Sequence, residues 1–320
     1  MLAAVLHSLG KPPRFEQFPE AAPGEGEVVV HVRAAALKPV DKAMASGSHY
    51  ASPRELPAVC GTDGLGRLED GTRVLFAGAR RPYGAMAERT VVPRGRCFPV
   101  PENVDDLTAA ALFNPGGSAW ITLNWRAKVV PGETVLILGA TGVTGKLAVQ
   151  MAKLLGAGRV IAAGRNEQVL STLSGFGADV TLRLDKPGQD LTEAFSREAG
   201  AGGFDVVIDY LWGLPTEALL AAMTRAEFAA ETSETRLVQV GESAGPTISL
   251  PAAVLRSTRL TILGTAGLPP PDILVDAFKQ VMARAAQGEL HIDTEPVPLA
   301  QIEDAWQRQD QQGRRLVVIP

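Results

Sequence analysis

A buried strand, a glycine-rich turn and a helix follow one another within residues 134–155, and this order constrains the fold more than any other stretch. Residues 134–138 are rich in β-branched and aliphatic side chains and carry no charge, as expected of a parallel strand buried on both faces. After the turn at 139–145, residues 147–155 place apolar side chains at helical spacing, and Gly156 stands where a helix C-cap is expected. The stretch therefore predicts one βα unit of a parallel sheet.

The turn in this unit is suited to binding a pyrophosphate. A helix N-terminus offers free backbone N–H groups and the positive end of a dipole, and glycine allows close approach of a ligand. The run departs from the G-x-G-x-x-G fingerprint because Ala140 stands at the position of the first glycine. A βα turn without a ligand is the alternative. If the turn binds a dinucleotide, the expected contacts are Ala140, Thr141, Gly142, Val143 and Thr144.

The second strand indicates which dinucleotide would bind. Residues 159–163 predict a strand that ends in Gly164, Arg165 and Asn166. A free ribose 2′-hydroxyl favours a carboxylate near this position, whereas a guanidinium binds a phosphate through a planar fork of donors. The strand tip carries Arg165 and no carboxylate, which predicts NADPH over NADH, with all three tip residues near the adenosine ribose. A solvated strand end is the alternative for Arg165, and it would leave the preference open.

From about residue 116 onward, strands and helices alternate, which is typical of a parallel sheet with helices on both faces. Further strands are predicted at 178–184, 204–209, 236–241 and 259–264, and further helices at 166–174, 189–199 and 214–223. Ligands of such sheets bind beyond the carboxyl ends of the strands. This rule adds four expected cofactor contacts, which are Val240, Gly241, Gly264 and Thr265.

Residues 1–115 predict a β-rich domain, because short strands separated by Gly and Pro are typical of a small barrel or sandwich. Helices are expected at 39–46 and 105–113, the second with Asn103 or Asp105 near its cap. The tail predicts helices at 273–286 and 299–309, an extended segment at 290–297 and a strand at 315–319 that returns to the first domain. The stretch 225–235 is rich in Glu and Thr and predicts a mobile surface connection.

Composition excludes several classes of function. The net charge is −4 with mixed signs, so nothing electrostatic favours nucleic acid or an anionic membrane. Cys60 and Cys97 are isolated in sequence, which is incompatible with a disulfide framework and fits a reducing cytosol. No apolar run has transmembrane length, and the first residues lack the features of a signal peptide. We therefore expect a cytoplasmic protein.

Five segments in this order and spacing resemble the medium-chain dehydrogenase/reductase superfamily and, within it, the zinc-free quinone oxidoreductases. They are 34–41 (AAALKPVD), the turn at 139–145, 204–209, 255–264 and 313–318. The resemblance implies an α/β protein with two domains: a GroES-like β-barrel catalytic domain (1–115 and 266–320) and a Rossmann NADPH-binding domain with a doubly wound parallel sheet (116–265). It also implies an active-site cleft between the domains and a homodimer, commonly formed by sheet extension.

The same resemblance bears on zinc. Zinc-dependent relatives carry a cysteine at the position that aligns with Lys38 and His-Glu where this chain has Thr62 and Asp63. Lysine is a cation at neutral pH and threonine is a poor ligand, whereas zinc requires Cys, His or carboxylate. The four histidines lie far apart, without ligand spacing. We therefore expect no metal.

Without a metal, the expected reaction is hydride transfer from NADPH to an electron-poor acceptor such as a quinone, because a modest hydrogen-bond donor then suffices at the developing oxyanion. Tyr50 and Lys38 are the candidate catalytic donors, and Thr62 and Asn114 the candidate substrate-binding residues. The alternative for Tyr50 is an aromatic side chain at the rim of the cleft that only packs on substrate or solvent. The alternative for Lys38 is an ion pair with Asp41 or Asp63. Asp41 is expected to hold the loop.

Two other basic residues remain open. Arg183 is a second candidate for the 2′-phosphate, with a solvated surface arginine as the alternative. Lys146, in the first helical turn after the glycine-rich turn, is either a phosphate contact or a surface lysine.

Three rival functions remain. The first is an alkene reductase acting on an enal, an enone or an acryloyl thioester, for which the basic pair Arg80-Arg81 is weak support. The second is a non-enzymatic NADPH-binding sensor on the same fold. The third, a short-chain dehydrogenase, is disfavoured because no tyrosine has a lysine four residues later.

Overall fold

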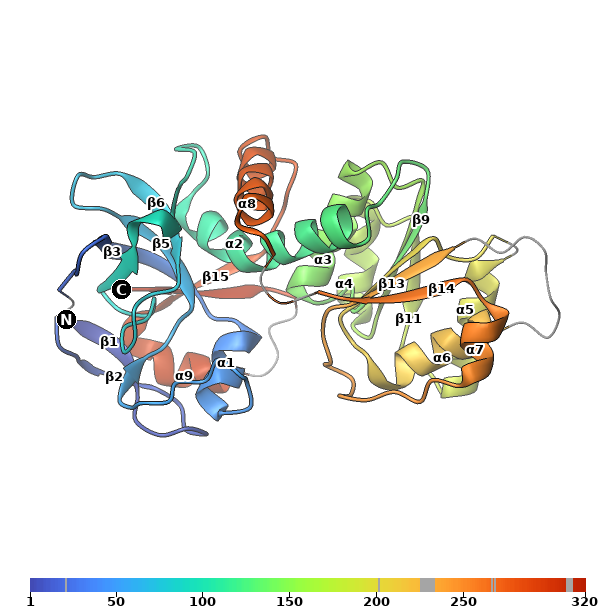
Figure 1. Cartoon of the computed structure of the whole chain (residues 1–320), viewed down its shortest axis with the longest axis horizontal. Helices are drawn as coiled ribbons and strands as arrows, with labels where there is room; N and C mark the ends of the chain where they lie inside the picture. Colours follow the sequence, from blue (N-terminus) through green and yellow to red (C-terminus); the bar gives the residue numbers. More distant parts are fainter. Residues whose placement is uncertain (21, 201, 225–233, 266, 268, 309–312) are drawn as a thin grey trace. The chain divides into compact units, whose positions relative to one another are not determined.

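The computed structural model of the 320-residue chain describes all residues except 21, 201, 225–233, 266, 268 and 309–312. The chain forms two compact units (Figure 1). Unit 1 comprises Met1–Pro115 and Phe278–Pro320, and unit 2 comprises Gly116–Ala277. Unit 1 is therefore built from two separate parts of the sequence, with the whole of unit 2 between them.

Unit 2 contains the predicted parallel sheet. Its six strands lie in the order β11-β10-β9-β12-β13-β14, and every neighbouring pair is parallel. The chain moves outward in one direction from β9 to β11 and in the other from β12 to β14, so the strand order reverses between β9 and β12. The bounds are β9 Thr134–Leu138, β10 Arg159–Gly164, β11 Val180–Arg183, β12 Val206–Asp209, β13 Thr235–Gln239 and β14 Leu260–Gly264.

Helices cover both faces of this sheet (Figure 1). The helices that follow β9 and β10 lie on one face, and those that connect β11 to β12 and β12 to β13 lie on the other. Phe195 and Phe204 are fully buried in the core on the second face. The bounds are α3 Val143–Leu154, α4 Glu167–Thr172, α5 Gly188–Ala199, α6 Gly213–Met223 and α7 Ala252–Ser257. The predicted α/β fold class is confirmed.

Unit 1 is β-rich, as predicted. A mixed sheet of seven strands has the path β15-β16-β3-β5-β6-β8, with β7 paired to β3, and a smaller sheet has the order β2-β1-β4. The predicted final strand does return to this unit, because Val317 and Val318 pair with Ala36 and Ala35. The bounds are β1 Leu2–Leu6, β2 Arg14–Gln17, β3 Glu27–Ala36, β4 Ala58–Val59, β5 Asp63–Arg67, β6 Arg73–Ala77, β7 Arg89–Pro93, β8 Cys97–Pro99, β15 Thr294–Pro298 and β16 Arg315–Ile319.

The helices of the tail and of the first residues largely follow the prediction. Helix α1 spans Pro39–Ser46, as predicted, and α8 spans Pro271–Ala286. The segment predicted as one helix at 299–309 is a 3₁₀ turn, Leu299–Gln301, followed by α9, Ile302–Gln307. Most of the predicted mobile connection lies at 225–233, outside the described residues.

The expected end of the second helix at residue 113 is wrong. Helix α2 runs from Asp106 to Trp120, through Pro115, and continues as a π-helix over Ile121–Arg126. Proline removes one helical hydrogen bond, but burial of Trp120 and its neighbours outweighs this local cost. The cap is Asp105, whose Oδ1 accepts the Thr108 N–H at 2.9 Å.

Candidate functional site

The glycine-rich turn of unit 2 has the geometry of a phosphate-binding loop. At Gly145 an added Cβ would lie 2.7 Å from Ala140 Cα and closer still to the Gly139 carbonyl oxygen, so only glycine allows α3 to pack against the end of β9. Gly142 is the N-cap of α3 and provides no side-chain cap. In the described chain, the N–H groups of Val143 and Thr144 donate to no backbone carbonyl outside the helix. They are therefore free to bind an anion.

The tip of β10 lies directly beside this turn. A Cβ on Gly164 would lie 2.8 Å from Thr141 Oγ1, so the absence of a side chain brings the two segments together. The next residue, Arg165, is exposed, and the structure gives its guanidinium no hydrogen bond or ion pair with any described residue. The predicted residues Thr141, Gly164 and Arg165 thus lie beside one another at the carboxyl edge of the sheet.

Three neighbouring polar residues are engaged with protein groups. Asn166 is the N-cap of α4, and its Oδ1 accepts the Val169 N–H at 3.1 Å. Arg183 forms ion pairs with Glu167 and Asp185. Lys146 is buried, with its ammonium 5.8 Å from the centre of the Phe176 ring. The description of Lys146 as a surface lysine is therefore wrong.

The end of β12 holds a buried carboxylate that the sequence did not single out. Asp209 accepts hydrogen bonds from the N–H groups of Leu211 and Trp212, and from Thr216 Oγ1 at 2.5 Å. Burial raises the pKa of this carboxyl despite these bonds. Asp209 fixes the entry into α6, while its carbonyl accepts the N–H groups of Val240 and Gly241. The signal available in the sequence was an acidic residue closing an otherwise apolar strand.

The two remaining predicted contacts are the last residue of β14 and the residue after it. Gly264 is exposed, with open space where a Cβ would be, and its carbonyl accepts a hydrogen bond from Arg126 Nε at 2.8 Å. Thr265 follows it in the chain.

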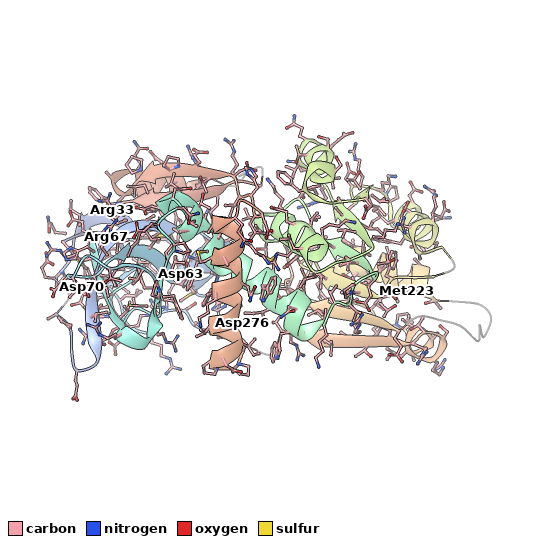
Figure 2. All side chains as sticks on the ribbon, turned by 90° about the horizontal axis from the view of Figure 1, so that it is seen from above. Arg33, Asp63, Arg67, Asp70, Met223 and Asp276 are labelled. Carbon is pink, nitrogen blue, oxygen red and sulfur yellow. The ribbon has the colours of Figure 1, made fainter. Side chains whose placement is uncertain are left out.

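In unit 1, Lys38 is the centre of a buried ionic network. Its side chain is 1% exposed, and its Nζ lies 3.0 Å from the Ala36 carbonyl, 3.1 Å from Asp63 Oδ1 and 3.3 Å from Asp41 Oδ2. The contacts with Ala36 and Asp63 are hydrogen bonds, and the contact with Asp41 is an ion pair. Figure 2 labels Asp63 within this unit. Burial opposes the charged form, but the two carboxylates outweigh it and raise the pKa of Lys38.

Thr62 and Asp41 belong to the same network. The N–H and Oγ1 of Thr62 lie 3.1 and 3.2 Å from Asp41 Oδ1, and Oγ1 lies 2.8 Å from Asp63 Oδ2. Asp41 also accepts the Lys38 N–H at 2.9 Å. Asp41 therefore holds the loop, as expected, and the structure brings Lys38 and Thr62 together.

Sequence reasoning missed Arg315 as a member of this network. Arg315 is buried at the start of β16, donates from Nη1 to the Leu37 carbonyl at 3.0 Å, and interacts electrostatically with Asp41 and Asp63. Burial lowers the pKa of its guanidinium. The network thus balances two cations with two carboxylates. An arginine opening an apolar strand was the signal in the sequence.

Tyr50 and Asn114 lie outside the Lys38 network. Tyr50 is 94% exposed, and its ring lies against that of His49 with the centroids 4.1 Å apart. The Ala51 N–H donates to His49 Nδ1 at 3.1 Å, which helps fix this loop. Asn114 is exposed on α2.

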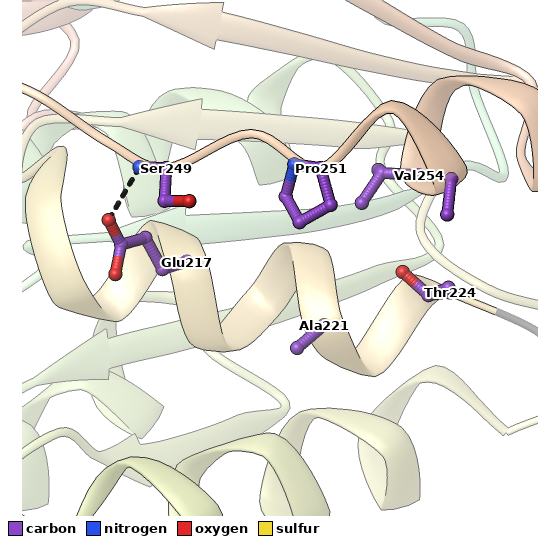
Figure 3. Close-up of a pocket in the computed structure, with 7 residues that line it drawn as sticks. Glu217, Ala221, Thr224, Ser249, Pro251 and Val254 are labelled. Atoms are coloured by element: carbon purple, nitrogen blue, oxygen red, sulfur yellow. Dashed lines mark hydrogen bonds between the residues drawn. The ribbon is translucent and has the colours of Figure 1, made fainter.

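A separate cavity of about 380 Å³ lies in unit 2, between α6 and the segment leading into α7 (Figure 3). At one end Glu217 accepts the Ser249 N–H at 2.6 Å. The rest of the lining is largely apolar and includes Ala221, Pro251 and Val254. None of the predicted site residues lines this cavity.

Comparison with known proteins gives a consistent result. Residues 143–287 match the family model of the zinc-binding dehydrogenases. A probable NADPH-dependent quinone reductase of Emericella nidulans is 27% identical, and the match covers 100% of both chains. The crystal structure of the quinone oxidoreductase from Thermus thermophilus is 28% identical, covers 100% of both chains and superposes with a TM-score of 0.81. The chain belongs to the medium-chain dehydrogenase/reductase superfamily. It is an oxidoreductase of the quinone oxidoreductase-like type.

Other members of this superfamily match over part of the chain. A 2-haloacrylate reductase of Burkholderia sp is 30% identical over 65% of this chain and 66% of its own.

The residues of this superfamily member do not fit a zinc ion. Within the described ranges, no three His, Cys, Asp or Glu side chains are grouped so that they could hold a metal. The polar groups around Lys38 are its ammonium, the Thr62 hydroxyl and the carboxylates of Asp41 and Asp63. An ammonium has no lone pair to offer a metal. The same part of the chain contains no helix that combines the length and apolar character needed to cross a bilayer.

Proposed function

We propose that this chain is a zinc-independent, NADPH-dependent quinone reductase. The proposal rests chiefly on the Lys38 network, in which an ammonium lies between two carboxylates at the position where the sequence resemblance implies a zinc ligand in zinc-dependent relatives. Without a Lewis acid, the acceptor must itself be electron-poor, as a quinone is. The names of the relatives from Emericella nidulans and Thermus thermophilus support the same substrate class.

The residues of unit 2 fit a bound NADPH. When bound, this cofactor supplies a hydride. The N–H groups of Val143 and Thr144, with Ala140, Thr141 and Gly142 in the same turn, would hold the pyrophosphate. The unpaired Arg165 would bind the 2′-phosphate, with Gly164 and Asn166 beside the ribose. The remaining contacts would come from Val240, Gly241 and Gly264.

Side chains of unit 1 would supply hydrogen bonds to the acceptor. The Tyr50 hydroxyl is the proposed donor to the developing oxyanion, because its side chain is almost wholly exposed and its hydroxyl has no hydrogen bond with a described residue. Thr62 and Asn114 are proposed as substrate-binding residues. Lys38 would act by holding Thr62 and both carboxylates in place, since its buried ammonium already donates hydrogen bonds to Ala36 and Asp63 and pairs with Asp41.

The test is NADPH oxidation by metal-stripped protein with a 1,4-quinone as acceptor, with NADH as the comparison. We expect turnover with the quinone, faster with NADPH, and no gain on adding zinc. In Tyr50→Phe, the loss of one donor should reduce kcat by roughly tenfold to a hundredfold. Nucleotide binding without quinone turnover would contradict the assignment.

Alkene reduction is the second candidate, and the 2-haloacrylate reductase of Burkholderia sp is the observation that favours it. The β-carbon of an enone also accepts hydride without a Lewis acid. A 2-alkenal assayed in parallel separates the two. Activity with the alkenal alone would move the substrate class to alkenes and leave the cofactor unchanged.

We further propose the organisation implied by the superfamily. The NADPH-binding domain would be 116–265 and the catalytic domain 1–115 and 266–320. Two copies would join along the edge strand β14, which among the described residues has one sheet partner, β13. A cytoplasmic location fits the two free cysteines.

A further inference from the structure

Two arginines lie at neighbouring strand ends on the carboxyl edge of the unit 2 sheet. Gly164 at the end of β10 pairs in register with Arg183 at the end of β11. Arg165 is the next residue after Gly164, so both guanidinium groups originate at the same corner of the sheet. Their surroundings differ: Arg165 has no partner among the described residues, whereas Arg183 has two carboxylates.

Arg183 holds both carboxylates through separate nitrogens. Its Nη1 donates to Glu167 Oε2 at 2.6 Å, its Nε donates to Asp185 Oδ1 at 3.0 Å, and its Nη2 donates to Asp185 Oδ2. The pair with Asp185 is thus bidentate, which is the geometry that fixes a carboxylate most firmly. The hydrogen bonds from Arg183 also lower the pKa of Asp185, so that it stays ionised.

Glu167 matters because of its place in the chain. It lies two residues after Arg165 and is 71% exposed, yet it pairs with Arg183 on the adjacent strand. A carboxylate released at this corner would have two effects on a dinucleotide. It would compete with the 2′-phosphate for Arg165 and repel that phosphate, and it could accept hydrogen bonds from the 2′-hydroxyl of NADH.

We propose that Arg183 is a positioning residue for cofactor choice, which keeps Glu167 and Asp185 away from Arg165 and thereby leaves Arg165 free for the 2′-phosphate of NADPH. This inference rests on the cofactor assignment in the proposed function. Arg183 acts through the carboxylates and does not itself touch the phosphate.

A double-mutant cycle tests this role by binding alone. Dissociation constants for NADPH and for NADH are measured by fluorescence titration for wild type, Arg183→Gln, the pair Glu167→Gln and Asp185→Asn, and the triple variant. Arg183→Gln should weaken NADPH binding by about fivefold, in the range of exposed charge effects, without weakening NADH binding. In the background without the two carboxylates, the same change should cost less than about twofold.

The cycle distinguishes a positioning role of Arg183, exerted through Glu167 and Asp185, from a direct contact between Arg183 and the 2′-phosphate. If Arg183 bound the phosphate itself, its removal would weaken NADPH binding at least as much in the background without the carboxylates, and this result would overturn the proposal. An unchanged ratio of the two dissociation constants in Arg183→Gln would overturn it as well. Arg259→Gln is the matched control, because Arg259 is another exposed arginine of unit 2 paired with a carboxylate, Glu234, and should leave the ratio unchanged.

The outcome also distinguishes this inference from the proposed function. If wild type binds NADPH tightly and selectively and Arg183→Gln leaves both dissociation constants unchanged, the positioning role of Arg183 is overturned and the cofactor assignment remains intact. Failure of wild type to bind either dinucleotide overturns both. Quinone turnover does not enter the measurement, so loss of activity with quinones would not affect the result.

Discussion

The ammonium of Lys38 donates hydrogen bonds to two oxygens inside unit 1 and pairs with Asp41, and neither it nor the carboxylates around it reach water to any extent. Removing one partner of a buried ion pair leaves an uncompensated charge in a medium that solvates it poorly. In Lys38→Met the shape is nearly kept, but Asp41 and Asp63 retain only the charge of Arg315. We expect the free energy of unfolding to fall by about 3–5 kcal/mol in urea denaturation.

Lys42→Met is the matched control, since Lys42 lies four residues later, on the helix that Lys38 caps. Its ammonium is more exposed and donates to the Arg308 carbonyl at 2.8 Å. Losing one such bond should cost about 1 kcal/mol or less. Equal losses in the two variants would contradict the view that the Lys38 network is a buried, balanced ionic cluster.

Part of this network was predictable from sequence. The motif around Lys38 and Asp41 indicated a pairing with Asp41 or Asp63 as one role for the lysine, and both contacts exist. The contribution of Arg315 was not predicted, because it comes from a strand far along the chain whose pairing with β3 is a property of the tertiary fold. Similarly, Arg165 and Arg183 each stand at the end of a predicted strand, so the sequence made both candidates for the 2′-phosphate. Only the structure shows that Arg183 is paired with two carboxylates.

At the level of elements, the glycines of the βα turn in unit 2 differ in how much space a side chain would have. Gly145 has no room for a methyl group, whereas the nearest atom to a Cβ on Gly142 is the Gly139 carbonyl oxygen at 3.5 Å, and φ at Gly142 is −78°. Gly145→Ala should therefore force α3 away from β9 and destabilise the protein by roughly 1–3 kcal/mol or more. Gly142→Ala should change stability by less than about 1 kcal/mol and weaken NADPH binding.

Thermal unfolding and NADPH titration of both variants check this difference. A stable Gly145→Ala with normal NADPH affinity would show that the turn can relax around a methyl group. Gly142→Ala serves as the comparison of the same size and chemistry, so a general effect of alanine in the turn would appear in both.

Elements with strong local patterns were predictable. The apolar runs of β9, β10, β12 and β14 and the helical spacing of α3 indicated their type and order. Helix α2 is the exception. Pro115 and the two glycines after it favour an end of the helix, whereas the buried side chains further on favour its continuation. Which of the two prevails depends on packing partners that a local pattern does not contain.

At the level of the whole molecule, the exposed edge of β14 predicts self-association. The Thr235 N–H donates to the Arg259 carbonyl, so in the parallel ladder the N–H groups of Leu260 and Ile262 point away from β13. We expect light scattering to give twice the mass of one chain. Ile262→Pro removes one outward donor and should shift the protein toward monomers at micromolar concentration.

Thr261→Val is the control for this prediction, because it keeps every backbone donor and adds no proline. A wild-type chain that remains monomeric at high concentration would contradict the prediction, as would an Ile262→Pro variant that dimerises as tightly as wild type.

The pairing of β16 with β3 has a consequence for synthesis. Strand β3 leaves the ribosome early, whereas β16 follows only after the whole of unit 2 has been made, on the order of tens of seconds later at ordinary elongation rates. Unit 2, a single continuous segment, can assemble in that interval. The end of β3 at Ala35 and Ala36 remains an open edge meanwhile. A ribosome stalled before β16 would therefore present a nascent chain with a finished nucleotide-binding unit and an adhesive, incomplete β-sheet, which is the kind of surface that chaperones bind.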